Sequence, residues 1–403
     1  MHTIYRNVSK KCYTQCRLSC STHVELIKGG MIVYFSIEPK KSREDLYDRE
    51  RELRKLHEAV ENGRMVLLCG LRRIGKTSLL QVFLNETSNK IFHAFIDCRR
   101  LVRNNKIARD TFNATFLKSV RSAFKKGKLK DVLRSISKVK FGEFELDLSR
   151  ENSDVDLFSY LDSVNEILTK HGKKMIIALD EAQNLRFYGR GGKDILNLFA
   201  YIYDHLNSIV VILTGSEIGL LHDFLKSNDP DTPLFGRYVN EISLGRFSKE
   251  KSMSFLSKGF QQIEIEIGKA EIEKAVATLD GIVGYLTMYG FTVYTRKEIS
   301  TALGETEKMA QKLVKKEIEE LRDRSENYLY ILKAVAFGLD RFSKIKEYIS
   351  LHHEKITDQT LSHNLSSLVK QSFLEQEYKR SSKIYVIPDP MVKATVLNMR
   401  KGS

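Results

Sequence analysis

The sequence predicts an α/β fold built on a parallel sheet and followed by a helical C-terminal part. Apolar segments of strand length alternate with helical patterns, as is typical of βα units, over residues 64–88, 91–97, 174–206 and 208–222. From Ser248 onward the pattern becomes helical and charged. The chain has 403 residues, about 150 more than one domain core usually holds, so we expect two or three domains.

Composition excludes several classes of protein. The hydrophobic fraction is 42%, which is enough to build packed cores and argues against a disordered chain. No apolar run approaches about 18 residues, so we expect neither a membrane-spanning nor a secreted protein. Lysine and arginine number 66 against 51 acidic residues, a net charge of +15 that favours polyanionic partners. The 5 cysteines are odd in number, which favours a reducing cytoplasm over a disulfide framework.

The first 30 residues do not share the pattern of the rest. A helix there would place three thiols and a histidine near one another for a soft metal, namely Cys12, Cys16, Cys20 and His23. Their spacing matches no common zinc motif, and Met31 stands just before the first pattern that resembles a domain. We therefore expect residues 1–30 to be a disordered extension or to precede the true start.

A glycine-rich loop follows the first strand. The apolar residues 64–69 lead into Gly70-Leu-Arg-Arg-Ile-Gly75-Lys76-Thr77, and a helical pattern follows. The order strand, G-x-x-x-x-G-K-T, helix is the context of a phosphate-binding P-loop, in which backbone N–H groups wrap the phosphates. Lys76 would contact the β- and γ-phosphates and Thr77 would ligate Mg²⁺. The predicted nucleotide-binding residues are Gly70, Leu71, Arg72, Arg73, Ile74, Gly75, Lys76, Thr77 and Ser78.

A second apolar strand, within residues 173–180, ends in two adjacent carboxylates, Asp180 and Glu181. In open α/β sheets ligands bind at the carboxyl ends of the strands. Asp180 is therefore placed to hold Mg²⁺ through water. Glu181 is placed to act as general base on the attacking water.

A third strand, residues 209–216, ends in two hydroxyls, those of Thr214 and Ser216. If it lies between the other two strands, Thr214 or Ser216 could contact the γ-phosphate or the attacking water. The alternative is that they cap the next helix. An arginine is also needed to neutralise charge on the transferred phosphoryl group. Arg237, after the turn at Gly236, is the candidate, from its own chain or from a neighbouring subunit of an oligomer; the alternative is an ordinary surface arginine.

These motifs resemble the archaeal ATPase family, a branch of the STAND class within the AAA+-type P-loop ATPases. The resemblance extends over most of residues 31–397 and includes segments 35–56, 213–217, 229–237 and 280–286. It implies a parallel sheet in the order 5-1-4-3-2 and ATP rather than GTP. It also implies that Tyr47, Asp48 and Arg49 border the base or ribose, the alternative being ordinary ion pairs at a helix N-terminus. The sequence departs from the family at Val283, where a lid proline is usual.

We expect a P-loop ATPase domain over residues 31–246, a helical lid over 247–322 and a winged helix-turn-helix over 323–403. The last rests on the order helix, helix, helix, hairpin. Its third helix would offer polar side chains to a DNA major groove, namely Gln359, Ser362, His363, Ser366 and Ser367. Its hairpin turn would contact phosphates through Lys379, Arg380 and Lys383. Winged helices also bind proteins, so a protein partner stays an alternative.

The long crossover over residues 100–170 should hold inserted helices and a small hairpin within 139–148. Residues 118–140 are strongly basic, and their cations either follow a phosphate backbone or form a solvated helix face. These cations are Lys118, Arg121, Lys125, Lys126, Lys128, Lys130, Arg134, Lys138 and Lys140.

Together these features predict a Mg²⁺-dependent ATPase that acts as a conformational switch. Nucleotide state would reposition the lid and winged helix for a partner, with duplex DNA favoured. The alternative is a nucleotide-gated regulator or scaffold with little turnover that binds a protein.

Overall fold

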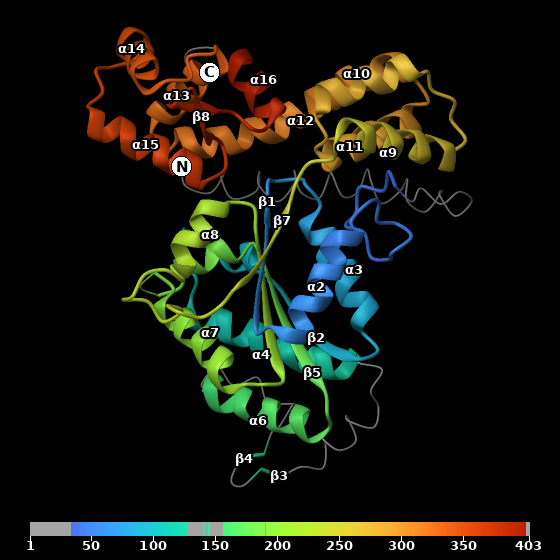
Figure 1. Cartoon of the computed structure of the whole chain (residues 1–403), viewed down its shortest axis with the longest axis vertical. Coiled ribbons are helices and arrows are strands. Elements are labelled where there is room, and N and C mark those ends of the chain that lie inside the picture. The colour runs from blue at the N-terminus through green and yellow to red at the C-terminus, as the bar shows by residue number, and fades with distance from the viewer. Residues whose placement is uncertain (1–33, 127–139, 142–143, 146–155, 190, 400–403) are drawn as a thin grey trace, which may run out of the picture.

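The computed structural model describes residues 34–126, 140–141, 144–145, 156–189 and 191–399. A parallel sheet flanked by helices forms the lower half of the molecule in Figure 1, and two helical lobes lie above the carboxyl ends of its strands. The cysteines considered as metal ligands, Cys12, Cys16 and Cys20, lie outside the described residues, as does the whole of 1–30. Within the described ranges, no helix is both long and apolar enough to cross a bilayer.

The sheet has five strands in the order β2-β5-β6-β1-β7, and every neighbouring pair is parallel. Its strands are β1 (Met65–Gly70), β2 (Ile91–Asp97), β5 (Lys174–Asp180), β6 (Ile209–Gly215) and β7 (Asn240–Leu244). Numbered along the chain within this sheet, the order is 5-1-4-3-2, which confirms the predicted topology. Because parallel strands end at one edge, the P-loop and the Asp180–Glu181 pair meet there.

Helices cover both faces of the sheet because successive residues of each strand point to opposite sides. Met65 and Leu67 of β1 join one apolar core, whereas Val66 and Leu68 join the other. One face packs against α2 (Glu50–Asn62) and α3 (Lys76–Thr87). The other packs against α4 (Arg109–Lys126), α6 (Leu157–Lys170), α7 (Lys193–His205) and α8 (Ile218–Leu225).

The two upper lobes share one apolar core. The lid contains α9 (Lys249–Gln262), α10 (Lys269–Leu279) and α11 (Val283–Arg296), and α12 (Ile299–Arg322) extends from it toward the winged helix. Tyr289 of the lid, Val314 of α12 and Leu332 of the winged helix belong to the same buried cluster. The lid and winged helix are therefore packed against each other along α12.

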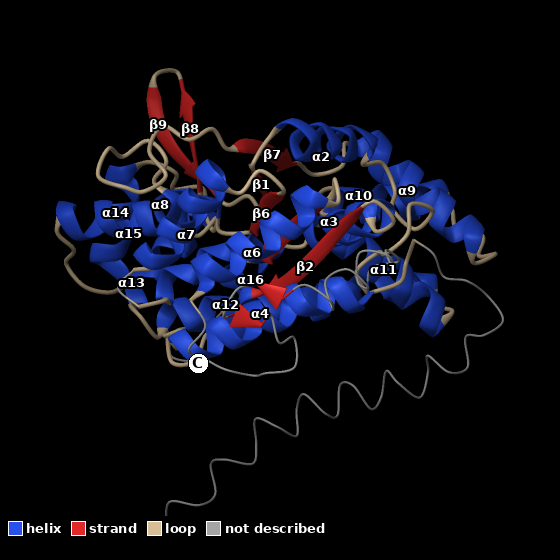
Figure 2. Ribbon diagram, turned by 90° about the horizontal axis from the view of Figure 1, so that it is seen from below, coloured by secondary structure: helices blue, strands red, loops and turns tan. Residues whose placement is uncertain are grey.

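The C-terminal lobe has the predicted order of three helices and a hairpin. Its elements are α13 (Glu326–Ala336), α14 (Phe342–His352), α15 (Asp358–Lys370), β8 (Glu375–Lys379) and β9 (Ser382–Val386). Figure 2 shows the β8–β9 hairpin projecting from the body of the molecule. A further helix, α16 (Pro390–Asn398), was not predicted; it starts with Pro390, and Asp389 caps it through the Met391 N–H.

The predicted hairpin within 139–148 is present in its described part. There β3 (Lys140–Phe141) pairs antiparallel with β4 (Phe144–Glu145). In the basic stretch, Lys118 and Arg121 lie on α4. Lys128, Lys130, Arg134 and Lys138 fall outside the described residues.

Candidate nucleotide-binding site

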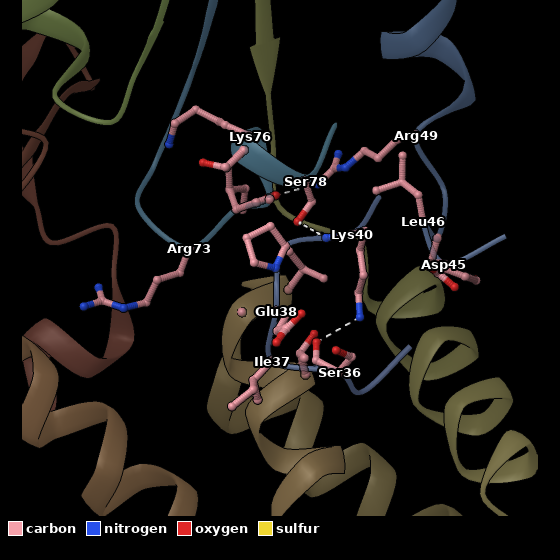
Figure 3. Close-up of a pocket in the computed structure, with 18 of the residues that line it drawn as sticks. Ser36, Ile37, Glu38, Lys40, Asp45, Leu46, Arg49, Arg73, Lys76 and Ser78 are labelled. Carbon is pink, nitrogen blue, oxygen red and sulfur yellow. Dashed lines mark hydrogen bonds between the residues drawn. The ribbon is translucent and has the colours of Figure 1, made fainter. Parts of the chain in front are cut away.

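A cavity of about 350 Å³ opens at the carboxyl edge of the sheet. Its walls come from three parts of the chain: the P-loop, the segment before α2, and the lid. Gly75, Lys76 and Thr77 form one side, and Val283 and Met288 of the lid form another. Figure 3 shows this cavity with residues of the entry segment, Ser36 to Lys40, along its wall.

The P-loop holds Lys76 inside the loop. Gly75 has φ +95°, a conformation open to glycine, and α3 begins at the next residue. Lys76 is 5% exposed, and its Nζ donates to the carbonyl oxygens of Gly70 at 2.9 Å and Leu71 at 2.8 Å. Burial lowers the pKa of Lys76 to about 8, although the charges of Glu181 and Asp180 oppose the shift. Its donors are thus held where phosphate oxygens could replace the two carbonyls.

Asp180 ends β5 beside the cavity-lining residues Thr77 and Glu181, and it is 1% exposed. Its carboxylate accepts hydrogen bonds from the hydroxyls of Thr77, at 3.1 Å, and of Thr214. Burial raises the pKa of Asp180 above its usual range. Hydroxyl and carboxylate oxygens are the donors that Mg²⁺ prefers, so Thr77 and Asp180 together fit this ion. Among the described residues, no cluster of three or more His, Cys, Asp or Glu side chains could hold a metal.

Glu181 follows β5 with φ +53°, a left-handed conformation. Its Oε2 accepts hydrogen bonds from the Gln183 amide at 2.7 Å, the Ser216 hydroxyl at 2.8 Å and the Ser216 N–H at 3.1 Å. Burial favours the protonated acid, but the charge of Lys76 and these hydrogen bonds outweigh it and lower the pKa of Glu181. The carboxylate is therefore ionised, as a general base must be.

Both hydroxyls beside the third strand contact these carboxylates. The Thr214 hydroxyl donates to Asp180 and accepts from the Glu181 N–H at 3.2 Å, while Ser216 donates to Glu181. Neither caps α8, because the N-cap position of that helix is Glu217 and it makes no side-chain cap. The alternative of a helix cap is therefore wrong for both residues.

Hydrogen bonds join the entry segment to α3, the helix that follows the P-loop, and join residues within the segment to one another. The Lys40 N–H donates to the Ser78 hydroxyl at 3.1 Å, and Lys40 Nζ donates to the carbonyl oxygens of Tyr34 and Ser36 at 3.0 and 2.9 Å. Burial lowers the pKa of Lys40 to about 8. These contacts hold residues 36–40 in the wall of the cavity.

Phe35 anchors the same segment to the lid. It is fully buried, and its ring fills the space that side chains at Gly259 and Gly290 would occupy, since a Cβ there would lie 2.2 and 2.3 Å from the ring. Tyr47 also lines the cavity and packs edge-on against Phe247 of the lid. The segment therefore connects the lid and the cavity directly.

The other two residues of the predicted base-binding trio have different surroundings. Asp48 forms an ion pair with Lys251 at 2.8 Å. Arg49 lines the cavity, but it is 6% exposed and its guanidinium donates to the carbonyl oxygens of Ile74 at 3.3 Å and Gly245 at 3.0 Å. Arg49 thus joins the P-loop to the end of β7.

Two P-loop side chains, Arg72 and Arg73, pair with carboxylates outside the loop, although Arg73 also lines the cavity. Arg72 donates to Glu217 at 2.7 Å and to the Gln371 carbonyl at 3.3 Å, and it lies 5.1 Å from the centre of the Phe373 ring. Arg73 donates to Glu317 of α12 at 2.5 Å, and Figure 3 shows its side chain turned away from the entry segment. Sequence reasoning included both arginines among the nucleotide-binding residues of the loop and did not foresee these contacts.

Arg237 lies apart from the cavity. Its Nε donates to Asp204 at 2.9 Å, and its guanidinium also contacts the Pro233 carbonyl. Among the described residues that line the cavity, Arg237 does not occur, whereas Arg99 does. Sequence reasoning missed Arg99, and the only signal available was a pair of arginines, Arg99 and Arg100, just after a strand.

The predicted DNA-contacting residues lie mainly on the surface of the winged helix. Side chains on α15 and on the hairpin turn are exposed, namely Gln359, Ser362, His363, Ser366, Lys379, Arg380 and Lys383. Ser367 is half-buried and accepts a hydrogen bond from Tyr328. The C-terminal end of α15 packs on α8, where Lys370 pairs with Asp223 at 2.7 Å.

Comparison with known proteins identifies the two main parts of the chain. A family of ATPase domains found predominantly in Archaea matches residues 46–289. The C-terminal winged helix-turn-helix domain of MCM proteins matches residues 319–386.

Solved structures extend this likeness over most of the chain. A Walker-type ATPase of Pyrococcus abyssi is 38% identical with a TM-score of 0.79, over 91% of this chain and 100% of that one. The ORC2 protein of Aeropyrum pernix, solved with ADPNP and ADP, has a TM-score of 0.60 at 12% identity, over 92% of this chain and 97% of that one. The second likeness is one of fold alone.

Among curated proteins, an uncharacterised ATP-binding protein of Pyrococcus horikoshii is 30% identical over 190 residues, which are 45% of this chain and 54% of that protein. The chain spans between 54% and 66% of the length of the curated relatives that it matches.

Proposed function

This chain belongs to the family of ATPase domains found predominantly in Archaea, and from that premise we propose that it hydrolyses ATP in the cavity between the P-loop and Glu181. The observation that carries the proposal is the contact set around Asp180 and Glu181. A buried lysine, a threonine hydroxyl and two strand-end carboxylates lie together, and the outer carboxylate is ionised. This set matches the parts that phosphoryl transfer to water requires.

In the proposed reaction, Lys76 leaves the carbonyls of Gly70 and Leu71 and binds phosphate oxygens. Glu181 accepts a proton from the attacking water as the water oxygen bonds to the γ-phosphorus. The bond between this phosphorus and the bridging oxygen breaks, which yields ADP and inorganic phosphate. Thr77 and Asp180 would hold Mg²⁺, which supplies positive charge against the phosphate oxygens.

We also propose that nucleotide state repositions the lid and winged helix. Three consecutive contacts link the base to the C-terminal lobe: Glu181 to Ser216, the neighbouring Glu217 to Arg72, and Arg72 to Gln371. A second link joins the P-loop to the lid, because the Gly284 N–H donates to the Arg73 carbonyl at 2.9 Å. A phosphate bound in the P-loop would therefore alter the contacts of the loop with both the C-terminal lobe and the lid.

Arg72→Ala should loosen the winged helix from the ATPase domain. A hydrogen bond to a charged group contributes about 1.5–3 kcal/mol, so the open fraction should rise about tenfold or more. Amide hydrogen exchange at residues 371–374 should speed up without nucleotide and lose its dependence on a non-hydrolysable ATP analogue. The control is Arg296→Ala, which removes a surface pair with Glu305. Wild-type exchange in Arg72→Ala would contradict the coupling.

We propose duplex DNA as the partner of the winged helix. The likeness to an MCM winged helix, the exposed polar face of α15 and the three cations of the hairpin turn support this. Arg380 and Ser381 both have positive φ, +48° and +63°, as a tight two-residue hairpin turn requires. Lys379 and Lys383 lie on the two strands beside this turn.

Replacing Lys379, Arg380 and Lys383 together by alanine should weaken duplex binding at least tenfold. The slope of log affinity against log salt should become shallower by up to about 2.7, because each phosphate contact contributes about 0.9. The control replaces three lysines that form ion pairs with glutamates on the helices α10, α12 and α14, namely Lys269, Lys315 and Lys344. Unchanged affinity would remove the turn from DNA binding.

That outcome would favour the second candidate, a nucleotide-gated scaffold that binds a protein. One observation supports it. The five residues of β8 are all exposed, and they include Glu375 and Glu377, which would repel a phosphate backbone and could pair with a basic protein surface.

A further inference from the structure

The proposed hydrolysis requires a cation near the transferred phosphoryl group in addition to Lys76. Arg237 does not meet this requirement within its own chain, because both ends of its guanidinium contact Asp204 and it lies outside the cavity lining. Arg72 and Arg73 point toward Glu217 and Glu317 instead. Three arginines line the described cavity. Arg49 is bound to backbone carbonyl oxygens and Arg73 to Glu317, whereas Arg99 lies beside Asp180.

Strand register brings Arg99 to the carboxylate pair. It lies in the short 3₁₀ helix Cys98–Leu101, which directly follows β2, and β2 neighbours β5 in the sheet. Asp97, the last residue of β2, stands opposite Asp180, the last residue of β5. The Arg99 Nη2 consequently lies 4.0 Å from Asp180 Oδ2, beside the residues that would handle the γ-phosphate.

Asp97 holds the Arg99 guanidinium in a fixed plane. Its Oδ1 accepts from Arg99 Nε at 3.0 Å and its Oδ2 accepts from Arg99 Nη2 at 3.1 Å, while Oδ1 also accepts the Arg99 backbone N–H. This paired contact uses two of the five N–H donors of a guanidinium, and the planar fork also suits phosphate oxygens. The side chain is 59% exposed, so an incoming phosphate can reach it.

We propose that Arg99 is a catalytic residue that binds the terminal phosphoryl group of ATP from within the same chain. The proposal rests on the proposed hydrolysis. As the water oxygen bonds to the γ-phosphorus, its proton goes to Glu181 and the electron pair of the breaking bond goes to the β-phosphate oxygen of ADP. Arg99 neutralises charge on the non-bridging oxygens during this step, and Asp97 is a positioning residue for it.

The test compares nucleotides that differ only in the terminal phosphate. Arg99→Ala should weaken binding of a non-hydrolysable ATP analogue about tenfold and change ADP binding less than twofold. Its turnover should fall by about 10²- to 10³-fold, and Arg99→Lys should recover part of both losses. Arg100→Ala is the matched control, since Arg100 is an exposed arginine in the same turn that does not line the described cavity.

If Arg99→Ala weakens the binding of the ATP analogue and of ADP equally, or weakens neither, the assignment is overturned. A residue that only stabilises the turn after Asp97 would affect the two nucleotides alike. The Arg99→Lys protein keeps this comparison available if the alanine variant does not fold. A third outcome is possible: the wild type releases no phosphate from ATP, yet Arg99→Ala still binds the ATP analogue more weakly while ADP binding is unchanged. That outcome would support the Arg99 contact but reject the proposed hydrolysis. The two failures are therefore distinguishable.

Discussion

Lys76→Ala is expected to weaken ATP binding by about 10²- to 10⁴-fold. The ammonium would exchange two carbonyl acceptors for phosphate oxygens on two phosphate groups, and each charge-assisted hydrogen bond contributes about 1.5–3 kcal/mol. The small alanine side chain leaves the loop backbone free to keep its N–H groups in place. Titration calorimetry with a non-hydrolysable ATP analogue measures the change.

The control for this variant is Lys269→Ala, which removes a lysine that is 80% exposed on the lid. Its affinity should match that of the wild type. If Lys76→Ala binds the analogue within threefold of the wild type, then Lys76 does not contact the phosphates, and the cavity is not the nucleotide site that we assign.

Glu181→Gln should keep ATP bound but lower turnover by about 10²- to 10⁴-fold, which is the usual contribution of a positioned general base. Glutamine has nearly the shape of glutamate, and its amide oxygen can still accept the Ser216 hydroxyl. It cannot take the proton of the attacking water. Single-turnover hydrolysis and analogue binding, measured on the same preparation, separate the two effects.

Glu166→Gln, an exposed change on α6, serves as the control for loss of a carboxylate. Wild-type turnover in Glu181→Gln would remove Glu181 from the role of base and would direct attention to Asp180. Loss of analogue binding together with turnover would indicate that the carboxylate acts mainly by holding the site in shape.

Contiguous motifs made the centre of the site predictable. Lys76 and Thr77 follow a strand directly, and Asp180 and Glu181 end one, so local pattern and the general rule for strand ends bring them together. The contacts of Thr214 and Ser216 depended in addition on β6 lying between β1 and β5. The family resemblance implied that order, whereas the local patterns alone did not.

Other features depended on tertiary contacts that no local pattern records. Arg99 reaches the site only through the register that sets Asp97 opposite Asp180. Arg72 lies in the P-loop motif, but such a loop binds phosphate with its backbone, which leaves the side chain to contact the C-terminal lobe. The apolar core that the lid shares with the winged helix was likewise not predicted, because the sequence of the lid is dominated by charged residues.

The most direct test of the account is phosphate release from Mg·ATP by the purified chain, with and without duplex DNA. We predict turnover in the wild type, a higher rate with duplex, and no release above background in Lys76→Ala. Tight binding of ATP with no phosphate release under either condition would contradict the central claim of hydrolysis. It would favour a nucleotide-gated scaffold with a protein partner.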